Sequence, residues 1–146
     1  MTLQRPHGRF VSVLLGLLAL GCVGVFATIV VAADRGALPA GIRRLYDWPG
    51  GDKAGHVALL ASVTFVVALA RRGRRVRLGP WAMPLAAVAV GVGITLEEAS
   101  QAWIPGRTLS VADLACSYLG IALGSWAAAI LRTRLGAVPA GAPRAT

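Results

Sequence analysis

The amino-acid sequence predicts an all-α membrane protein, a bundle of four transmembrane helices with the N-terminus and the C-terminus both cytoplasmic. The chain of 146 residues is 56% hydrophobic and has a mean hydropathy of +0.68. Only 14% of its residues are charged, whereas soluble domains carry about 25%. The apolar residues are gathered into four long runs, and basic residues stand at the ends of those runs. These observations exclude an ordinary soluble domain.

The four runs are residues 10–33, 55–70, 80–96 and 109–131. A helix that crosses a hydrocarbon core of about 30 Å needs roughly 20 mostly apolar residues. The first and last runs are long enough alone. The middle two fall short unless each extends toward the polar residues at one of its ends.

The first run has a second interpretation. Arg5 and Arg9 ahead of an apolar run resemble a signal peptide, and the small residues at 31–33 resemble a cleavage site. Because the run is longer than the 7–15 residues typical of a signal core, we favour a retained helix. Cys22 and Cys116 both lie inside apolar runs, so we interpret them as packing residues rather than a disulfide framework.

The arginines set the predicted orientation. With four spans, one side of the membrane receives the N-terminus, the 71–79 loop and the C-terminal tail, which carry ten basic residues. The other side carries five basic residues and all six acids. Since cytoplasmic loops are enriched in Lys and Arg, both termini are expected inside. This distribution accounts for the net charge of +9 better than a nucleic-acid-binding surface does.

The predicted organisation has three parts. Residues 1–9 form a cytoplasmic N-terminus, residues 10–132 form the membrane domain, and residues 133–146 form a disordered cytoplasmic tail. The tail is rich in Ala, Gly and Pro, a composition that buries too little apolar surface to fold. The oligomeric state is left open.

Polar residues from three separate segments are predicted to meet at one depth. Counted back about 20 residues from their cytoplasmic ends, the last three spans reach the outer boundary near residues 51, 99 and 112. Arg107 joins them from the connection between the last two spans. Since ionisable groups at membrane depth usually face the protein interior or a wet cavity, we predict an outward-opening polar pocket. The residues that fall at this boundary are Asp52, Lys53, His56, Glu97, Glu98, Gln101 and Asp113.

Helical spacing sharpens this prediction. Asp52 and His56 are four residues apart and share a face, and Glu98 and Gln101 are three apart and do likewise. Glu97 points roughly 100° away around the helix, so we leave it out of the site. A further stripe runs along the last span, and its small residues would let another helix approach closely. Its members are Asp113, Ser117, Gly120 and Gly124.

Four short motifs, in order, resemble those of the VanZ-like membrane proteins. They are DKAGH at 52–56, EASQ at 98–101, PGR at 105–107 and SVADLACSYLGIALG at 110–124. The family shows Asp-Lys-x-x-His at the start of one membrane helix, then Glu-x-x-Gln, an Arg after a Pro-Gly turn, and an Asp followed by Asn and glycines. The resemblance covers residues 52–124, about half of the chain. Ser117 stands where the family usually has Asn, and serine lacks the paired donors and acceptor of the amide.

The resemblance implies a multi-pass protein of the bacterial plasma membrane that acts in the cell envelope. Its namesake is linked to reduced susceptibility to glycopeptide antibiotics of the teicoplanin type. The first hypothesis is therefore a pocket that binds an anionic envelope lipid, a peptidoglycan precursor or a glycopeptide. The residues assigned to ligand binding are Asp52, Lys53, Gln101, Arg107 and Ser117.

The alternative is a membrane-embedded enzyme that acts on a lipid-linked envelope substrate. His56 would serve as general base, Glu98 or Asp113 as acid or orienting group, and Arg107 would steady developing negative charge. A metal-assisted version would add Asp52, but one histidine with scattered carboxylates is thin evidence for zinc. We predict no metal and no cofactor.

A purely structural interpretation stays open beside both. Asp52 would cap a helix, Lys53 would extend to lipid headgroups, and Ser110-x-x-Asp113 matches a capping box. Arg107 would bridge Glu98 and Asp113 in an ion-pair network that holds the helices together. An acid near the C-terminal end of a helix opposes the helix dipole, so we favour a site role for Glu98.

Overall fold

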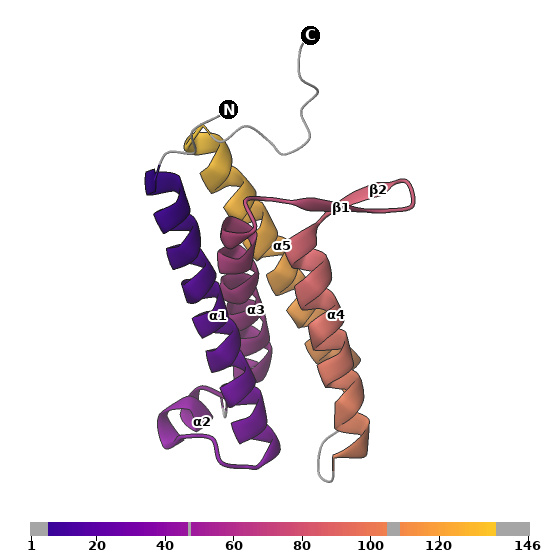
Figure 1. Ribbon diagram of the computed structural model, residues 1–146. Coiled ribbons are helices and arrows are strands. Elements are labelled where there is room, and N and C mark those ends of the chain that lie inside the picture. The colour runs from indigo at the N-terminus through magenta and orange to yellow at the C-terminus, as the bar shows by residue number, and fades with distance from the viewer. Residues whose placement is uncertain (1–5, 47, 105–108, 137–146) are drawn as a thin grey trace.

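The computed structural model describes residues 6–46, 48–104 and 109–136, and these parts of the chain are mostly helical (Figure 1). Two short strands and one 3-10 turn interrupt the helices. In chain order the elements are α1 (Pro6–Asp34), α2 (Ala40–Tyr46), α3 (Gly51–Ala70), β1 (Arg75–Leu78), β2 (Trp81–Pro84), α4 (Leu85–Ser100), η1 (Gln101–Trp103) and α5 (Val111–Arg134).

Three of the described helices are long and apolar enough to cross a membrane. The candidate spans are Val13–Ala32, Gly51–Ala70 and Val111–Arg134, of 20, 20 and 24 residues. The second begins at Gly51 and so includes Asp52 and Lys53, which confirms that this short apolar run is extended at its polar end. At about 1.5 Å per residue, 20 residues match a hydrocarbon core of about 30 Å.

The run at 80–96 folds differently from its prediction. Helix α4 starts only at Leu85, continues past the apolar run to Ser100, and comprises 16 residues before the turn of η1. By its rise α4 measures about 24 Å, which is shorter than the three candidate spans. A four-span topology therefore stays a prediction, and so does the placement of both termini inside.

The start of the predicted fourth-span run, residues 81–84, pairs with residues 75–78 of the preceding loop in a β-hairpin. The all-α prediction did not include this hairpin. Strand β1 pairs with β2 in antiparallel register from Arg75↔Pro84 to Leu78↔Trp81. Gly79 opens the two-residue loop with φ +60, the sign that a type II′ turn favours at this place. Pro84 then precedes α4 with φ −59, and the hairpin projects sideways from the bundle (Figure 1).

Helices α3 and α5 form the most extensive contact of the fold. They run parallel, and both end where α1 begins (Figure 1). A Cβ at Gly120 would lie 2.5 Å from the carbonyl oxygen of Val57, and one at Gly124 would lie 3.0 Å from the backbone nitrogen of Phe65. The predicted small-residue stripe is therefore confirmed as a close helix–helix contact, because only glycine fits at these two positions.

Other elements surround this pair. Leu60, Ile94 and Ile121 form one buried cluster that joins α3, α4 and α5. Near the other end, Ala68, Ala86 and Ala128 form a second. Helices α4 and α5 are also joined where the Thr95 hydroxyl lies 2.8 Å from the Tyr118 hydroxyl.

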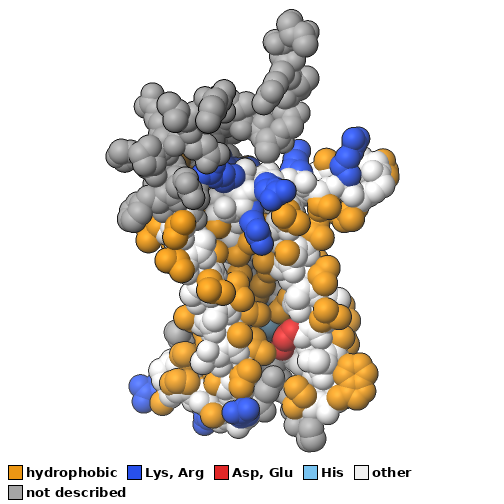
Figure 2. All heavy atoms as spheres, viewed as in Figure 1, with side chains coloured by type: hydrophobic (Ala, Val, Ile, Leu, Met, Phe, Trp, Pro, Cys, Tyr) orange, Lys and Arg blue, Asp and Glu red, His pale blue; other side chains and the backbone are white. Residues whose placement is uncertain are grey.

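The outer faces of the helices are apolar and exposed. Leu17 and Leu20 on α1, Leu96 on α4 and Trp126 on α5 are each more than half exposed. Figure 2 shows apolar side chains over much of the visible flank of the bundle. Large contiguous apolar surfaces mark membrane or partner contacts, so this flank fits a lipid environment.

The close contact of α3 with α5 yields a stability prediction. Gly124→Ala should lower the free energy of unfolding in detergent by about 1–3 kcal/mol, the usual cost of overpacking, because the added methyl group meets the Ala61 backbone. Gly93→Ala on α4 is the matched control, since a Cβ there meets nothing within 4 Å. Thermal melts of both variants test this, and equal melting temperatures would contradict the packing.

Candidate functional site

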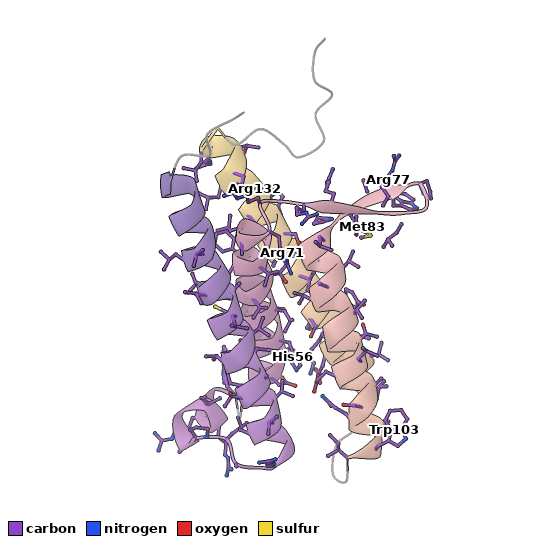
Figure 3. All side chains as sticks on the ribbon, in the orientation of Figure 1. His56, Arg71, Arg77, Met83, Trp103 and Arg132 are labelled. Atoms are coloured by element: carbon purple, nitrogen blue, oxygen red, sulfur yellow. The ribbon has the colours of Figure 1, made fainter. Side chains whose placement is uncertain are left out.

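The polar residues predicted to share one depth lie at one end of the helix bundle. Helix α3 begins there, α4 ends there and α5 begins there (Figure 1). In Figure 3, His56 lies in the half of the bundle that ends at Trp103, away from Arg71 and Arg132. Contacts at this end join α3 to α5 and α4 to α5, so the sequence prediction that three segments converge is confirmed.

The start of α5 is fixed by two hydrogen bonds. Ser110 is the N-cap residue, and its hydroxyl oxygen accepts a hydrogen bond from the Asp113 backbone N–H at 3.2 Å. The Ser110 backbone N–H donates to Glu98 Oε1 at 2.6 Å. In a capping box the residue at the position of Asp113 would accept this second bond. Here Glu98, from α4, accepts it instead.

The role of Glu98 follows from its surroundings. Its side chain is only 2% exposed, and its carboxylate is bonded to the first turn of another helix. Negative charge near a helix N-terminus is favourable, which offsets its unfavourable place at the end of α4. Glu98 therefore joins α4 to α5 through a buried hydrogen bond, and its role as a catalytic acid stays a prediction.

This arrangement leaves the Asp113 carboxylate available. Asp113 Oδ1 lies 3.6 Å from Lys53 Nζ, and within the described chain this buried oxygen has no hydrogen-bond partner. Lys53 Nζ also donates to Asp52 Oδ2 at 3.0 Å. One ammonium group thus lies between a carboxylate of its own helix and a carboxylate of α5.

Asp52 and Lys53 form the open side of the site. Their side chains are 41% and 47% exposed. The N-cap of α3 is Gly50, without a side-chain cap, so Asp52 does not cap the helix as one interpretation of the sequence held. It shares a helix face with His56 by spacing, yet its hydrogen bond goes to Lys53.

One turn further along, His56 contacts Ser117. His56 Nδ1 lies 3.1 Å from Ser117 Oγ, and either atom donates depending on the tautomer of the ring. Ser117 is completely buried, whereas His56 is partly exposed. Lys53–Asp113 and His56–Ser117 therefore link α3 to α5 at two successive levels.

Gln101 has a different partner from the one its spacing suggested. Its Nε2 donates to Glu97 Oε1 at 2.8 Å, so Glu97, which the sequence analysis set aside, contributes to this end of α4. Its spacing of four residues from Gln101 was the signal that would have found it. Arg107 lies outside the described residues, and its predicted bridge from Glu98 to Asp113 does too.

Within the described ranges no group of three His, Cys, Asp or Glu side chains is placed to hold a metal ion. No family model, no curated protein and no solved structure matches this chain. The fold and the contacts define a helical bundle with three candidate membrane-spanning helices and a polar cluster at one end.

The hydrogen bond of Glu98 yields the second prediction. Glu98→Leu should destabilise the protein by about 1–3 kcal/mol, because the Ser110 N–H then has no acceptor. Glu98→Gln keeps an oxygen acceptor of nearly the same shape and should cost less. Denaturant melts in detergent measure both, and equal losses in the two variants would show that this hydrogen bond does not fix the start of α5.

Proposed function

We propose that this chain is a multi-pass protein of the bacterial plasma membrane, similar to the VanZ-like proteins, and that its polar cluster binds an envelope ligand. The outer cluster is defined here as Asp52, Lys53, His56 and Asp113, with the buried Ser117 behind His56 as a supporting residue that does not touch the ligand. The ligand is an anionic envelope lipid, a peptidoglycan precursor or a glycopeptide antibiotic of the teicoplanin type. By binding it, the protein protects the cell against such antibiotics. Support comes from the three apolar helices and from the ordered motifs in residues 52–124.

The observation that carries this proposal is that Glu98, rather than Asp113, accepts the Ser110 N–H at the start of α5. The Asp113 carboxylate is therefore not consumed by helix capping. It faces the Lys53 ammonium at 3.6 Å, a distance longer than a tight ion pair. A polar ligand can therefore compete for either group without breaking a tight ion pair.

The charges of the outer cluster indicate the chemistry of the ligand. The Lys53 ammonium carries three donors and is 47% exposed, so it suits a carboxylate or phosphate. Asp52 and Asp113 suit amide or ammonium donors on the same ligand. The exposed apolar flank beside them suits a ligand that is itself partly buried in the membrane.

The position of the arginines supports an outward-facing cluster. Arg71, Arg74, Arg75 and Arg77 follow α3, and Arg132 and Arg134 lie in the last turn of α5. Of these residues, Arg71, Arg77 and Arg132 lie toward the end of the bundle opposite His56 (Figure 3). Since the arginine-rich side of a membrane protein is normally cytoplasmic, the outer cluster would face outward.

The enzyme hypothesis has one observation in its favour. A histidine within hydrogen-bond reach of a serine is the arrangement that activates a nucleophile, and His56 and Ser117 lie 3.1 Å apart. However, Ser117 is completely buried between α3 and α5, so a substrate cannot reach its hydroxyl. Ligand binding is therefore favoured, and His56 acting as a general base on a bound substrate is the second candidate.

The third prediction distinguishes a ligand-binding role of the outer cluster from a purely structural one. In a host that depends on this protein for survival with teicoplanin, Lys53→Gln and Asp113→Asn should each reduce protection at least severalfold, because the ligand loses a charged partner. Arg44→Gln is the control, since Arg44 is an exposed cation on α2, outside the outer cluster. Survival is scored beside membrane abundance and thermal stability.

The outcomes separate the hypotheses. Loss of protection at normal abundance and stability supports a binding site. Loss of abundance or stability in both variants would show that the cluster is a structural ion-pair network instead. If His56→Gln alone abolishes protection and Lys53→Gln does not, acid–base catalysis replaces binding as the explanation.

A further inference from the structure

A second polar region lies at the opposite end of the bundle, around a cavity of about 680 Å³. It is bounded by α1, by the ends of α3 and α5, and by the base of the hairpin. No acidic side chain lines it among the described residues. Five arginines do: Arg71, Arg72, Arg74, Arg75 and Arg132.

The cavity combines this charge with apolar walls. Leu15 of α1, Leu69 of α3 and Leu131 of α5 line it together with alanines. A free anion needs only the cations, whereas a phospholipid needs cations for its phosphate and an apolar wall for its chains. The lining therefore has the two chemistries of a lipid with an anionic headgroup.

Arg132 is held so that its guanidinium reaches this cavity. It packs over Gly73, where a Cβ would collide with its terminal nitrogen and carbon atoms, and Gly73 adopts φ +65 in the turn after α3. Arg132 Nε is buried and has no hydrogen-bond partner among the described residues, and the same holds for Ser125 Oγ. Both residues line the cavity, so two buried donors there lack an acceptor.

The hairpin marks the depth of the membrane interface. Its register pairs Val76 with Met83 and Leu78 with Trp81 on one face, and Arg75 and Arg77 lie on the other. In Figure 3, Arg77 points away from the helices, whereas Met83 lies on the side from which α4 descends. Figure 2 likewise shows basic side chains above the apolar part of the hairpin.

Such a hairpin fits the plane between lipid tails and headgroups. Trp81 is 71% exposed, and tryptophan is enriched at this interface. The cavity lies at the same level, because Arg75 and Pro84 belong both to the hairpin and to the cavity lining. Basic pockets between helices at the cytoplasmic side of a membrane are suited to lipid phosphates.

We propose that this cavity is a binding site for an anionic phospholipid of the arginine-rich leaflet. The guanidinium of Arg132, with Arg71 and Arg75, holds the phosphate, and an acyl chain lies along Leu15 and Leu131. The apolar face of the hairpin rests on the same leaflet and closes the site from the side. This proposal assumes the membrane placement proposed above but is independent of the outer cluster and its ligand.

The test uses the full chain, purified in a neutral detergent. Native mass spectrometry measures how tightly phosphatidylglycerol, phosphatidylcholine and inorganic phosphate bind to the wild type and to three variants. Arg132→Gln removes the guanidinium. Ala129→Leu fills the cavity while all five arginines remain, because Ala129 also lines it. Arg77→Gln is the matched control, since Arg77 lies on the hairpin outside the cavity lining.

Phosphatidylglycerol should bind the wild type more tightly than phosphatidylcholine. Arg132→Gln should weaken it roughly tenfold, the effect expected from the loss of a charge-assisted hydrogen bond. Ala129→Leu should also weaken it, because the larger side chain fills space that the lipid would occupy. Arg77→Gln should leave it unchanged. If Arg132→Gln and Arg77→Gln weaken phosphatidylglycerol binding equally, the lipid is held by diffuse surface charge and the proposed site is wrong. Displacement of the lipid by millimolar inorganic phosphate would show a free-anion site instead.

A melting curve without lipid shows whether each variant is folded, so Ala129→Leu keeps the test valid if Arg132→Gln does not fold. Lys53→Gln and Asp113→Asn should bind phosphatidylglycerol as the wild type does. If these two variants lose protection against the antibiotic while lipid binding persists, the proposed function and the lipid site stand separately. If Ala129→Leu binds phosphatidylglycerol as tightly as the wild type does, the lipid site is wrong while the proposed function is unaffected.

Discussion

The close parallel contact between α3 and α5 is the constraint on which the rest of the structure depends. Gly120 and Gly124 allow the α5 backbone to meet that of α3, and this fixes which side chains face each other along both helices. Toward the start of the helices the contact brings Lys53 to Asp113 and His56 to Ser117. Toward their ends it brings Arg132 over Gly73. The two polar regions are therefore products of a single helix register.

The two ends of the bundle handle charge in different ways. At the outer cluster, acids and bases from neighbouring helices lie together, and Glu98 from α4 takes over a capping bond that would otherwise occupy Asp113. At the arginine-rich end, arginines line a cavity, and no Asp or Glu is among its lining residues in the described chain. The first arrangement joins helices through contacts between opposite charges, whereas the second places cations beside apolar walls.

Part of this structure follows from the sequence because spacing alone determines it. The stripe from Asp113 to Gly124 recurs every three or four residues, which places it on one helix face, and span length places Asp52, Glu98 and Asp113 at one depth. The hairpin was missed because residues 80–84 are as apolar as a helix, and periodicity cannot separate short apolar runs. The Gly79-Pro80 pair was the available turn signal. Which carboxylate accepts the Ser110 N–H depends on the tertiary position of α4, which spacing within one helix does not specify.

The most direct test of this account is disulfide cross-linking between α3 and α5 in native membranes. With Cys22 and Cys116 replaced by alanine, the chain carrying His56→Cys and Ser117→Cys is treated with a membrane-permeable oxidant. A second chain carries His56→Cys and Thr133→Cys, at opposite ends of the pair. The parallel register predicts an intramolecular disulfide in the first chain and none in the second. A disulfide in the second chain alone would mean that α3 and α5 run antiparallel, and the outer cluster would not exist as described.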